Sequence, residues 1–426
     1  MFTTILIFLV ILVLLNIPLA VSIGIVSLIY LYQQNIPLLI IPKLMIESVD
    51  SFPFLAFPLF VLMGLLMNSG GISQRIFNFA NCIVGHLRGG LGHVNILASV
   101  IFSGMSGNVI ADAGGLGVIE IEAMRKEGYD DEFSAGITAA SATIGPIIPP
   151  SIPMVIYAMS FEASVGALFI GGIIPGLIMA VTLMIAVFLI ARKRDYPKRE
   201  RMASFSELWQ SFKKAFFPIL TPVILLGGIF SGIFTPTEAA AIAVVYAVIL
   251  GFIVYRELSF SDVPGLCVQV LKNLGTVLFI LATVSVFTWI LSRERVPEQL
   301  INLIIRRDVT PAQFLIISNI ILLVLGCFTT ITPSIILLGP IFYPLIQTLG
   351  IDPVHFGVVM VLNLMIGALT PPVGPVLYVI SDIAGLSFFR IFKASLPFII
   401  PLFLTLLLIT FVPQVVMVLP KLLMGD

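Results

Sequence analysis

Residues 144–153 read Ile-Gly-Pro-Ile-Ile-Pro-Pro-Ser-Ile-Pro and interrupt an otherwise apolar stretch that runs from 133 to 160. Each proline removes a backbone N–H and clashes with the preceding helical turn, so a helix through this stretch must break and leave carbonyl groups without partners. Inside a bilayer, such backbone is tolerated only where it is buried in protein or lines a cavity. The stretch therefore predicts a broken membrane helix at a functional site.

A second break follows 222 residues later, where residues 366–375 read Ile-Gly-Ala-Leu-Thr-Pro-Pro-Val-Gly-Pro. The same offset, without a gap, aligns Gly104 with Gly326, Leu116 and Gly117 with Leu338 and Gly339, Gly128 and Asp130 with Gly350 and Asp352, and Pro175 with Pro397. Chance recurrence is the alternative in a chain with 34 Gly and 28 Pro. The constant offset favours an internal duplication, which in transporters often marks the binding site.

The composition is that of a membrane protein, since 59% of the 426 residues are apolar and only 10% are charged. Lys plus Arg and Asp plus Glu number 22 each, and no dense basic stripe indicates a nucleic acid partner. Cys82, Cys267 and Cys327 show no spacing typical of a disulfide framework or a zinc site. The first apolar run begins at Ile5 and is too long for a signal peptide, so we expect it to be retained as a membrane helix.

We predict an all-α polytopic membrane protein made of two repeats, 1–192 and 216–426, joined by a cytoplasmic loop and interfacial segment at 193–215. Each repeat is expected to contain about five transmembrane helices, a re-entrant hairpin and a broken helix. The hairpins are predicted at 93–124 and 311–349, and the broken helices at 133–160 and 354–381. The other predicted segments are 3–32 with a break at Asn16-Ile17-Pro18, 52–69, 164–192, 216–232, 236–255, 273–292 and 390–419.

The two repeats are predicted to have opposite orientations, because an odd number of crossings inverts the second half. The basic loop at 193–215 then lies in the cytoplasm with most of the Lys and Arg residues, as the positive-inside rule requires. The exceptions, which remain on the outer side, are Arg293, Arg295, Arg306 and Arg307. Segments 72–88 and 294–308 precede the two hairpins and mix charged with apolar residues, so we expect them to be interfacial arms.

The tip of the first hairpin, residues 102–112, is rich in Gly and small polar residues and predicts irregular backbone. Oxygen ligands without a buried charge suit a sodium ion. The first sodium site is predicted to use Ser103, Ser106 and Asn108 from the tip and carbonyls of Gly145, Ile148 and Pro149 from the break. For this half alone, a proline kink packed against small residues is an equally good interpretation.

The second half repeats this pattern, with hydroxyl groups in the tip at 326–334 and freed carbonyls in the break at 367–375. We therefore predict a second sodium site. Its expected residues are Gly326, Thr329, Thr330, Gly367, Thr370 and Val373. The first tip carries Ser, Asn and Asp where the second carries Thr and Ser, so the two sites should not be equivalent.

A solute site is expected between the two inverted hairpin tips, where the N-termini of half-helices offer donors to an anionic group such as a carboxylate. The candidate solute-binding residues are Asn108, Asp112, Ser151, Thr332 and Ser334. Asp112 has two further interpretations, as a group that closes the first ion site or as a helix cap. Glu238 follows Thr235-Pro236-Thr237 and is predicted to cap a helix start.

Several of these motifs, in this order, resemble the large, DctM-like membrane subunit of tripartite ATP-independent periplasmic (TRAP) transporters. They are Ser103–Asp112, Ile144–Ser151, Gly232–Ala241 and Thr370–Gly374, and the resemblance covers essentially the whole chain. It implies a sodium-driven secondary importer of the ion transporter superfamily that works by an elevator movement in the bacterial inner membrane, with two or more Na⁺ ions and no organic cofactor.

The resemblance further implies two partners, a small four-helix membrane subunit and a periplasmic binding protein that delivers an organic acid such as a sialic acid, a C4-dicarboxylate or a uronate. No extension that would supply the small subunit precedes residue 1, so we expect a separate chain.

Other classes are less well supported. A stand-alone sodium/dicarboxylate symporter is the main alternative. An anion channel is disfavoured by the doubled breaks. The chain has no His-Glu-x-x-His motif and no paired catalytic groups for intramembrane hydrolysis, so no enzymatic activity is expected.

Overall fold

The computed structural model describes residues 7–9, 11–13, 15, 17–50, 52–194, 196–197 and 201–425, without the side chains of Phe52, Pro53, Ser106 and Ala111. The described residues form helices and the turns that connect them, and none of them is in a strand. The predicted all-α fold is therefore confirmed. Asn16, in the predicted break of the first segment, and the first residues of that segment lie outside the described residues.

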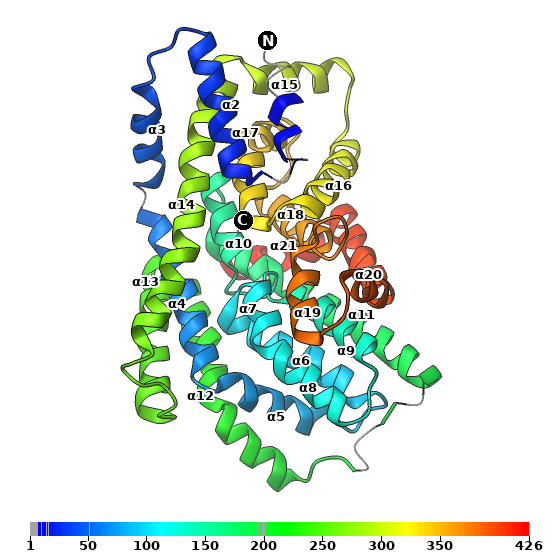
Figure 1. Ribbon diagram of the computed structural model, residues 1–426. Coiled ribbons are helices and arrows are strands. Elements are labelled where there is room, and N and C mark those ends of the chain that lie inside the picture. Colours follow the sequence, from blue (N-terminus) through cyan, green and yellow to red (C-terminus); the bar gives the residue numbers. More distant parts are fainter. Residues whose placement is uncertain are drawn as a thin grey trace.

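The helices form two groups, which lie side by side in Figure 1. The scaffold group, on the left, consists of α2 (Leu19–Gln33), α3 (Ile40–Val49), α4 (Ala56–Ser69), α12 (Phe205–Phe230), α13 (Pro236–Val248) and α14 (Val263–Arg293). The hairpin group, on the right, contains α6 (Gly90–Ser106), α7 (Val109–Gly114), α8 (Leu116–Lys126), α9 (Asp131–Ser141), α10 (Ile152–Ser160), α11 (Val165–Arg194), α16 (Pro311–Phe328), α17 (Ile331–Thr348), α18 (Pro353–Gly367), α19 (Pro375–Ala384), α20 (Phe388–Phe411) and α21 (Gln414–Met424).

The helices of the two hairpins agree with the predicted positions. In the first, the chain leaves α6 through Gly107, whose φ of 57° is the left-handed conformation that favours glycine, and returns along α7 and α8. In the second, it leaves α16 through Thr329 and Thr330 and returns along α17. Moved back by 222 residues, α17 covers 109–126, the combined span of α7 and α8.

Both broken helices are present. The first consists of α9, a short 3₁₀ turn at Ala142–Ile144 and α10, and the second of α18 and α19. The α10 half begins at a true N-cap, because the Ser151 hydroxyl accepts a hydrogen bond from the Met154 N–H at 3.2 Å. The peptide bonds Pro149–Pro150 and Pro371–Pro372 are both cis.

The arms lie at opposite ends of the molecule. The first arm, α5 (Ile72–Val84), lies at the lower end in Figure 1, and the second, α15 (Val296–Arg306), at the upper end. Helix α4 meets α5 at an angle of 70°. Two repeats of opposite orientation require this placement of the arms, and it supports the predicted inversion.

Several predicted boundaries were wrong for identifiable reasons. Helix α12 begins at Phe205, well before the predicted 216, because Ser204 and Glu207 form a capping box inside the predicted segment 193–215. Helix α14 begins at Val263, where 273 had been predicted, and the last segment divides into α20 and α21 at Pro413. Helix α3 was not predicted, since it is short and none of its residues is buried.

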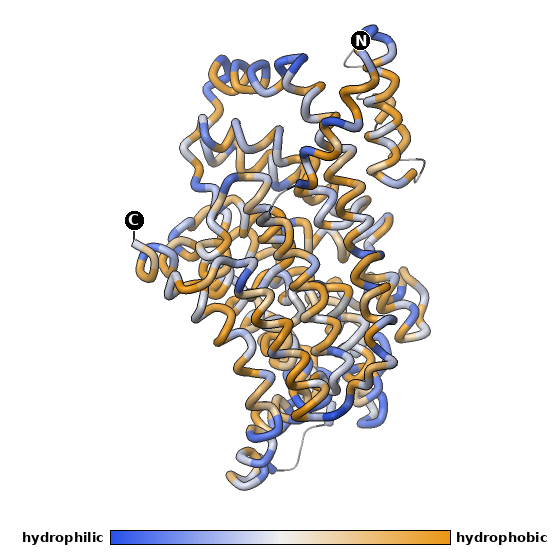
Figure 2. The backbone as a smooth tube through the Cα atoms, turned by 90° about the vertical axis from the view of Figure 1, so that its left-hand side faces the viewer, coloured by the Kyte–Doolittle hydropathy of each residue, from blue (hydrophilic) through white to orange (hydrophobic). Residues whose placement is uncertain are grey.

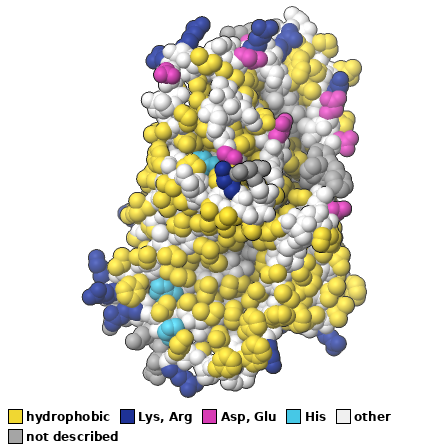
Figure 3. Space-filling view, turned by 180° about the vertical axis from the view of Figure 1, so that it is seen from behind, with side chains coloured by type: hydrophobic (Ala, Val, Ile, Leu, Met, Phe, Trp, Pro, Cys, Tyr) yellow, Lys and Arg dark blue, Asp and Glu magenta, His cyan; other side chains and the backbone are white. Residues whose placement is uncertain are grey.

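The surface agrees with a multi-pass membrane protein. Within the described part of the chain, seven helices are long and apolar enough to cross a bilayer, or eight if α4 and α5 are one bent span. Hydrophilic residues concentrate toward the two ends of the molecule in Figure 2, and apolar side chains dominate the face between them in Figure 3. The remaining crossings are then made by pairs of shorter helices, namely the broken helices α9–α10 and α18–α19.

Candidate functional site

The first hairpin tip packs directly on the first break. The Ile152 N–H donates a hydrogen bond to the Gly107 carbonyl at 3.3 Å. A Cβ atom at Gly107 would lie 2.4 Å from the Pro150 carbonyl oxygen, so only glycine permits this approach. The tip and the break that the sequence pairs are therefore in contact.

Among the predicted ligands of the first sodium site, Ser103, Gly145 and Pro149 are buried, whereas Asn108 and Ile148 are half-buried. Ser103 is fully buried, and its hydroxyl donates to the Val100 carbonyl at 2.6 Å, which leaves its oxygen lone pairs available. Among the described residues, no backbone N–H donates to the carbonyl of Gly145, Ile148 or Pro149. These are the freed carbonyls that the prolines predict, whereas the side chain of Ser106 lies outside the described residues.

Asp112 belongs with this first set of ligands. It is buried within α7, and a Cβ atom at Gly145 would lie only 2.0 Å from Asp112 Oδ2. Its carboxylate thus lies against the break and is not among the groups that line the cavity described below. Of the three roles considered for Asp112, closing the first ion site agrees best with this position.

The second tip and the second break are also joined through the backbone. The Cys327 carbonyl accepts hydrogen bonds from the N–H groups of Val373 at 3.0 Å and Gly374 at 3.4 Å. The Thr370 hydroxyl lies 2.9 Å from Cys327 Sγ and donates to the Gly367 carbonyl at 2.7 Å. That carbonyl also accepts the Thr370 N–H at 2.9 Å, so both of its lone pairs are used.

The remaining hydroxyl groups of the second tip divide into two sets. The hydroxyl groups of Thr329 and Ser334 are 2.5 Å apart, and Ser334 also donates to the Thr330 carbonyl at 3.0 Å. Ser334 is fully buried in this local network. Thr330 and Thr332 instead line the cavity between the tips.

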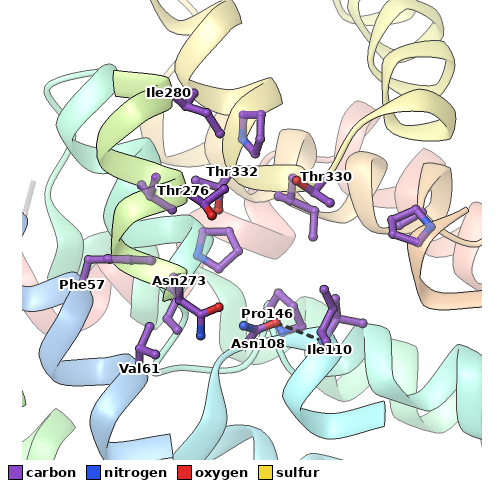
Figure 4. Close-up of a pocket in the computed structure, with 18 residues that line it drawn as sticks. Phe57, Val61, Asn108, Ile110, Pro146, Asn273, Thr276, Ile280, Thr330 and Thr332 are labelled. Atoms are coloured by element: carbon purple, nitrogen blue, oxygen red, sulfur yellow. Dashed lines mark hydrogen bonds between the residues drawn. The ribbon is translucent and has the colours of Figure 1, made fainter. Parts of the chain in front are cut away.

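A cavity of about 240 Å³ lies where the two tips, the two breaks and the scaffold helices α4 and α14 meet. Figure 4 shows Asn108 from the first tip on one side, Thr330 and Thr332 from the second tip on the other, and Asn273 and Thr276 from α14 along a third side. Asn108 Oδ1 accepts the Ile110 N–H at 3.0 Å, which fixes the side chain at the start of α7. Ser151 is buried as the N-cap of α10 and is not among the lining residues.

The sequence did not indicate Asn273, Thr276 or Glu120. The first two were missed because the predicted segment began at 273, which made Asn273 a terminal residue although it lies well inside α14. A sequence search for polar residues one helical turn apart would have found the pair. Glu120 is buried in α8, and Oε1 has no hydrogen-bond partner among the described residues, but its sequence context is that of an ordinary amphipathic helix.

The chemistry of this site is that of neutral donors and acceptors. No charged residue is among the described groups that line the cavity, and no cluster of three His, Cys, Asp or Glu residues occurs in the described part of the chain. Amide and hydroxyl groups at the cavity suit a small polar solute, and freed carbonyls with hydroxyl groups suit a hard, singly charged cation.

Doubled hairpins and broken helices around a central cavity with a few amide and hydroxyl groups are the architecture of a membrane transporter. The sequence profile of the DctM component of tripartite ATP-independent periplasmic transporters matches residues 5–415. The chain belongs to this family, as the motifs in the tips and breaks predict.

Individual relatives agree with this assignment. The sialic acid TRAP transporter large permease protein SiaM of Vibrio cholerae is 47% identical over 381 residues, which is 89% of each chain. The C4-dicarboxylate TRAP transporter large permease protein DctM of Pseudomonas aeruginosa is 40% identical over 88% of each chain. The crystal structure of the YdaH transporter of Alcanivorax borkumensis shares the fold, with a TM-score of 0.62, 13% identity and 86% of each chain covered.

These relatives settle the general predictions of class and location. They are named as transporter permeases, so the chain is a transport protein and not an enzyme. It is a multi-pass protein of the bacterial inner membrane, in agreement with its apolar spans.

Proposed function

We propose that this protein imports a small organic acid, delivered by a periplasmic binding protein, and couples the import to an inward sodium gradient. The observation that carries the proposal is the cavity of about 240 Å³ at which both hairpin tips and both helix breaks meet. A solute held there contacts every irregular segment that the two halves contribute, so its binding is linked to the conformation of the tips.

The proposed solute carries a carboxylate. The amide groups of Asn108 and Asn273 and the hydroxyl groups of Thr330 and Thr332 line the cavity and are of the kind that bind a carboxylate, and both named relatives are named for acids, a sialic acid and a C4-dicarboxylate. Hydrogen bonds to an ionised group contribute about 1.5–3 kcal/mol each, so a few of them bind an acid without an arginine.

We propose that sodium is bound where each tip contacts its break, next to the cavity that Asn108 and Thr330 also line. At the first contact the ligands are Ser103, Asn108 and the carbonyls of Gly145, Ile148 and Pro149, with Asp112 close enough to balance the charge. At the second contact the proposed ligands come from Gly326, Thr329, Thr330, Thr370 and Val373. The Gly367 carbonyl acts indirectly, because it accepts hydrogen bonds from the hydroxyl and the N–H of Thr370 and so positions that residue.

The proposed movement is of the elevator type. The hairpin group carries both tips and both breaks, while α4 and α14 close the cavity from the scaffold group. Displacement of the hairpin group along the scaffold moves the solute away from Asn273 and Thr276, whereas Asn108 and Thr332 travel with it. The interfacial arms α5 and α15 connect the two groups.

Two partner chains belong to the proposal, a separate small membrane subunit with four helices and the binding protein that presents the acid. The exposed apolar surface of the scaffold helices, including Leu271 and Val268 on α14, is available for the small subunit.

Transport in proteoliposomes tests the proposal. The chain is reconstituted with its small subunit, labelled acid is supplied on the binding protein, and an inward sodium gradient is imposed. We expect uptake that stops when potassium replaces sodium or when the binding protein is omitted. Equal uptake in potassium would reject sodium coupling, and equal uptake of free acid would identify a stand-alone symporter.

A further inference from the structure

A second cavity, of about 400 Å³, lies between α9, α11 and α20 and shares no lining residue with the solute site. Its floor is apolar and includes the rings of Phe133 and Phe398, whose centroids are 5.8 Å apart in an edge-to-face arrangement, and Ile190 from α11. Its rim is basic and includes Lys193 and Lys393. A cavity with an apolar floor and a cationic rim matches a molecule that is itself amphipathic.

The two arginines of the rim form ion pairs with acidic residues, whereas the two lysines can bind an anion. Arg194 bonds to Asp130 at 2.9 Å and Arg390 to Glu132 at 2.7 Å. Burial would raise the pKa of Asp130, but hydrogen bonds from Tyr196, the Phe133 N–H and Arg194 lower it below its ordinary value, so this pair is charged. Within the described part of the chain, Lys193 and Lys393 form no ion pair, and both are exposed.

Exposed apolar side chains continue from the cavity along α11 and α20. On α11, Ile185, Phe188 and Leu189 are 53%, 46% and 55% exposed, and on α20, Leu396 and Ile400 are 44% and 61% exposed. These residues precede the rim on α11 and follow it on α20, so the apolar surface lies on the bilayer side of the basic residues. A soluble anion would leave this apolar surface and the cavity floor unused.

We propose that this cavity binds an anionic phospholipid. The phosphate lies between Lys193 and Lys393, and one acyl chain runs from the floor at Ile190 and Phe398 along the exposed faces of α11 and α20. Basic cavities between membrane helices at the cytoplasmic surface are suited to such headgroups. The predicted orientation, with the loop after α11 in the cytoplasm, places the rim at this level.

The three helices that form the site belong to the hairpin group, and α9 is the first half of the first broken helix. A lipid bound here therefore lies on the group that carries the solute site and not on the scaffold. Binding of the lipid does not depend on the transported solute or on sodium, and it can be measured on the chain alone.

The experiment uses the full-length chain purified in a neutral detergent and compares retention of phosphatidylglycerol and phosphatidylcholine by native mass spectrometry. The test variant is K193Q/K393Q. The matched control is K213Q/K214Q, which removes two exposed lysines from α12, outside the cavity. We expect preferential retention of phosphatidylglycerol by the parent chain and the control. In the test variant its apparent affinity should fall by about fivefold per lysine, or about 25-fold in total.

A photoactivatable phosphatidylglycerol with its reactive group in the acyl chain gives a second readout, which should label α11 and α20 in the parent chain. K193R/K393R retains both charges and should retain lipid. Monodisperse gel filtration of every variant separates loss of the site from loss of the fold. The proposal is overturned if K193Q/K393Q binds the lipid as the parent does, if labelling falls outside the two helices, or if inorganic phosphate displaces the lipid at equal concentration.

Discussion

Gly326 and Gly367 touch each other through their backbones, and a Cβ atom added to Gly367 would lie 2.7 Å from the Gly326 Cα atom. One glycine belongs to the helix that leads into the second hairpin tip, and the other ends the first half of the second broken helix. Because the obstructing atoms are backbone and not a flexible side chain, no rotamer change relieves the contact. The distance between tip and break is therefore set by these two residues.

We expect Gly367→Ala to separate the second tip from its break. Overpacking at a rigid contact typically costs about 1–3 kcal/mol. The variant should unfold at a lower temperature and lose most sodium-driven uptake, which thermal unfolding and the proteoliposome assay will measure. The matched control is Gly227→Ala in α12, where a Cβ atom meets nothing within 4 Å and alanine favours the helix. An uptake by Gly367→Ala equal to that of the control would show that the contact is not needed for transport.

The tips and breaks could be predicted from the sequence because their Gly, Pro and small polar residues are unfavourable inside a membrane helix. Prolines at 149, 150, 371 and 372 cannot continue a helix, and the 222-residue offset shows which tip belongs with which break. The contacts between Gly107 and Ile152 and between Cys327 and Val373 agree with that pairing. Local chemistry and internal repetition were sufficient here.

The sequence did not predict the contribution of the scaffold. Asn273 and Thr276 belong to α14, a regular apolar helix, and their spacing of one helical turn does not by itself mark them as part of a site. Their role comes from tertiary packing, which places one face of α14 opposite the tips. In the same way, Asp112 contacts Gly145 only because α7 packs on the first break, so its sequence position alone left three roles open.

A negative charge at Asn273 should prevent binding of an acid. Asn273→Asp replaces an N–H donor with a carboxylate on the wall of a cavity that we propose binds a carboxylate, and like charges in a partly enclosed site repel strongly. We expect the half-saturating concentration of the acid to rise by at least about 10–100-fold, which corresponds to loss of one charge-assisted hydrogen bond. Initial uptake rates over a range of acid concentrations measure the change.

Asn78→Asp is the control for this prediction, because it adds the same charge to an exposed position on the arm α5, away from the cavity. It should leave the half-saturating concentration of the acid unchanged. Normal affinity in Asn273→Asp would remove α14 from the solute site.

The hydroxyl group of Thr370 should determine the sodium dependence more than the affinity for the solute. It bonds to the Gly367 carbonyl at 2.7 Å and contacts Cys327 Sγ, but it is not among the residues that line the cavity. Thr370→Val keeps the shape and removes the oxygen. We expect the half-saturating sodium concentration to rise about tenfold or more, with little change in solute affinity at saturating sodium.

Thr405→Val is a suitable control because Thr405 is also buried and also donates to a backbone carbonyl within a helix, that of Pro401 at 2.9 Å. It should reduce stability by about 1 kcal/mol without altering sodium dependence. If both variants require the same sodium concentration as the parent, Thr370 is not a ligand.

The arm α5 is held to the scaffold by an ion pair between Arg75 and Glu257, whose nearest atoms are 2.5 Å apart. The pair is partly buried, with side chains 22% and 39% exposed, and Arg75 also donates to the Gly71 carbonyl at 2.7 Å and lies over the Tyr255 ring. Gly71 has a φ of 66°, and a Cβ atom there would collide with the Glu257 carboxylate. The arm thus begins at a turn that requires glycine, and the Glu257 carboxylate of the scaffold holds this turn in place.

Exchange of the two charges isolates the contribution of the pair. Arg75→Glu and Glu257→Arg each place two like charges in contact, so each should lower the unfolding temperature, and the double variant should recover part of the loss. The recovery is incomplete because the bonds of Arg75 to Gly71 and Tyr255 are not restored. A coupling free energy of about 1 kcal/mol is expected, at the upper end for an exposed pair.

The same exchange at Lys43 and Glu47, 3.8 Å apart and 70% and 60% exposed, should give no measurable coupling, because solvent screens that pair. Equal coupling at the two sites would mean that Arg75 and Glu257 do not fix the arm.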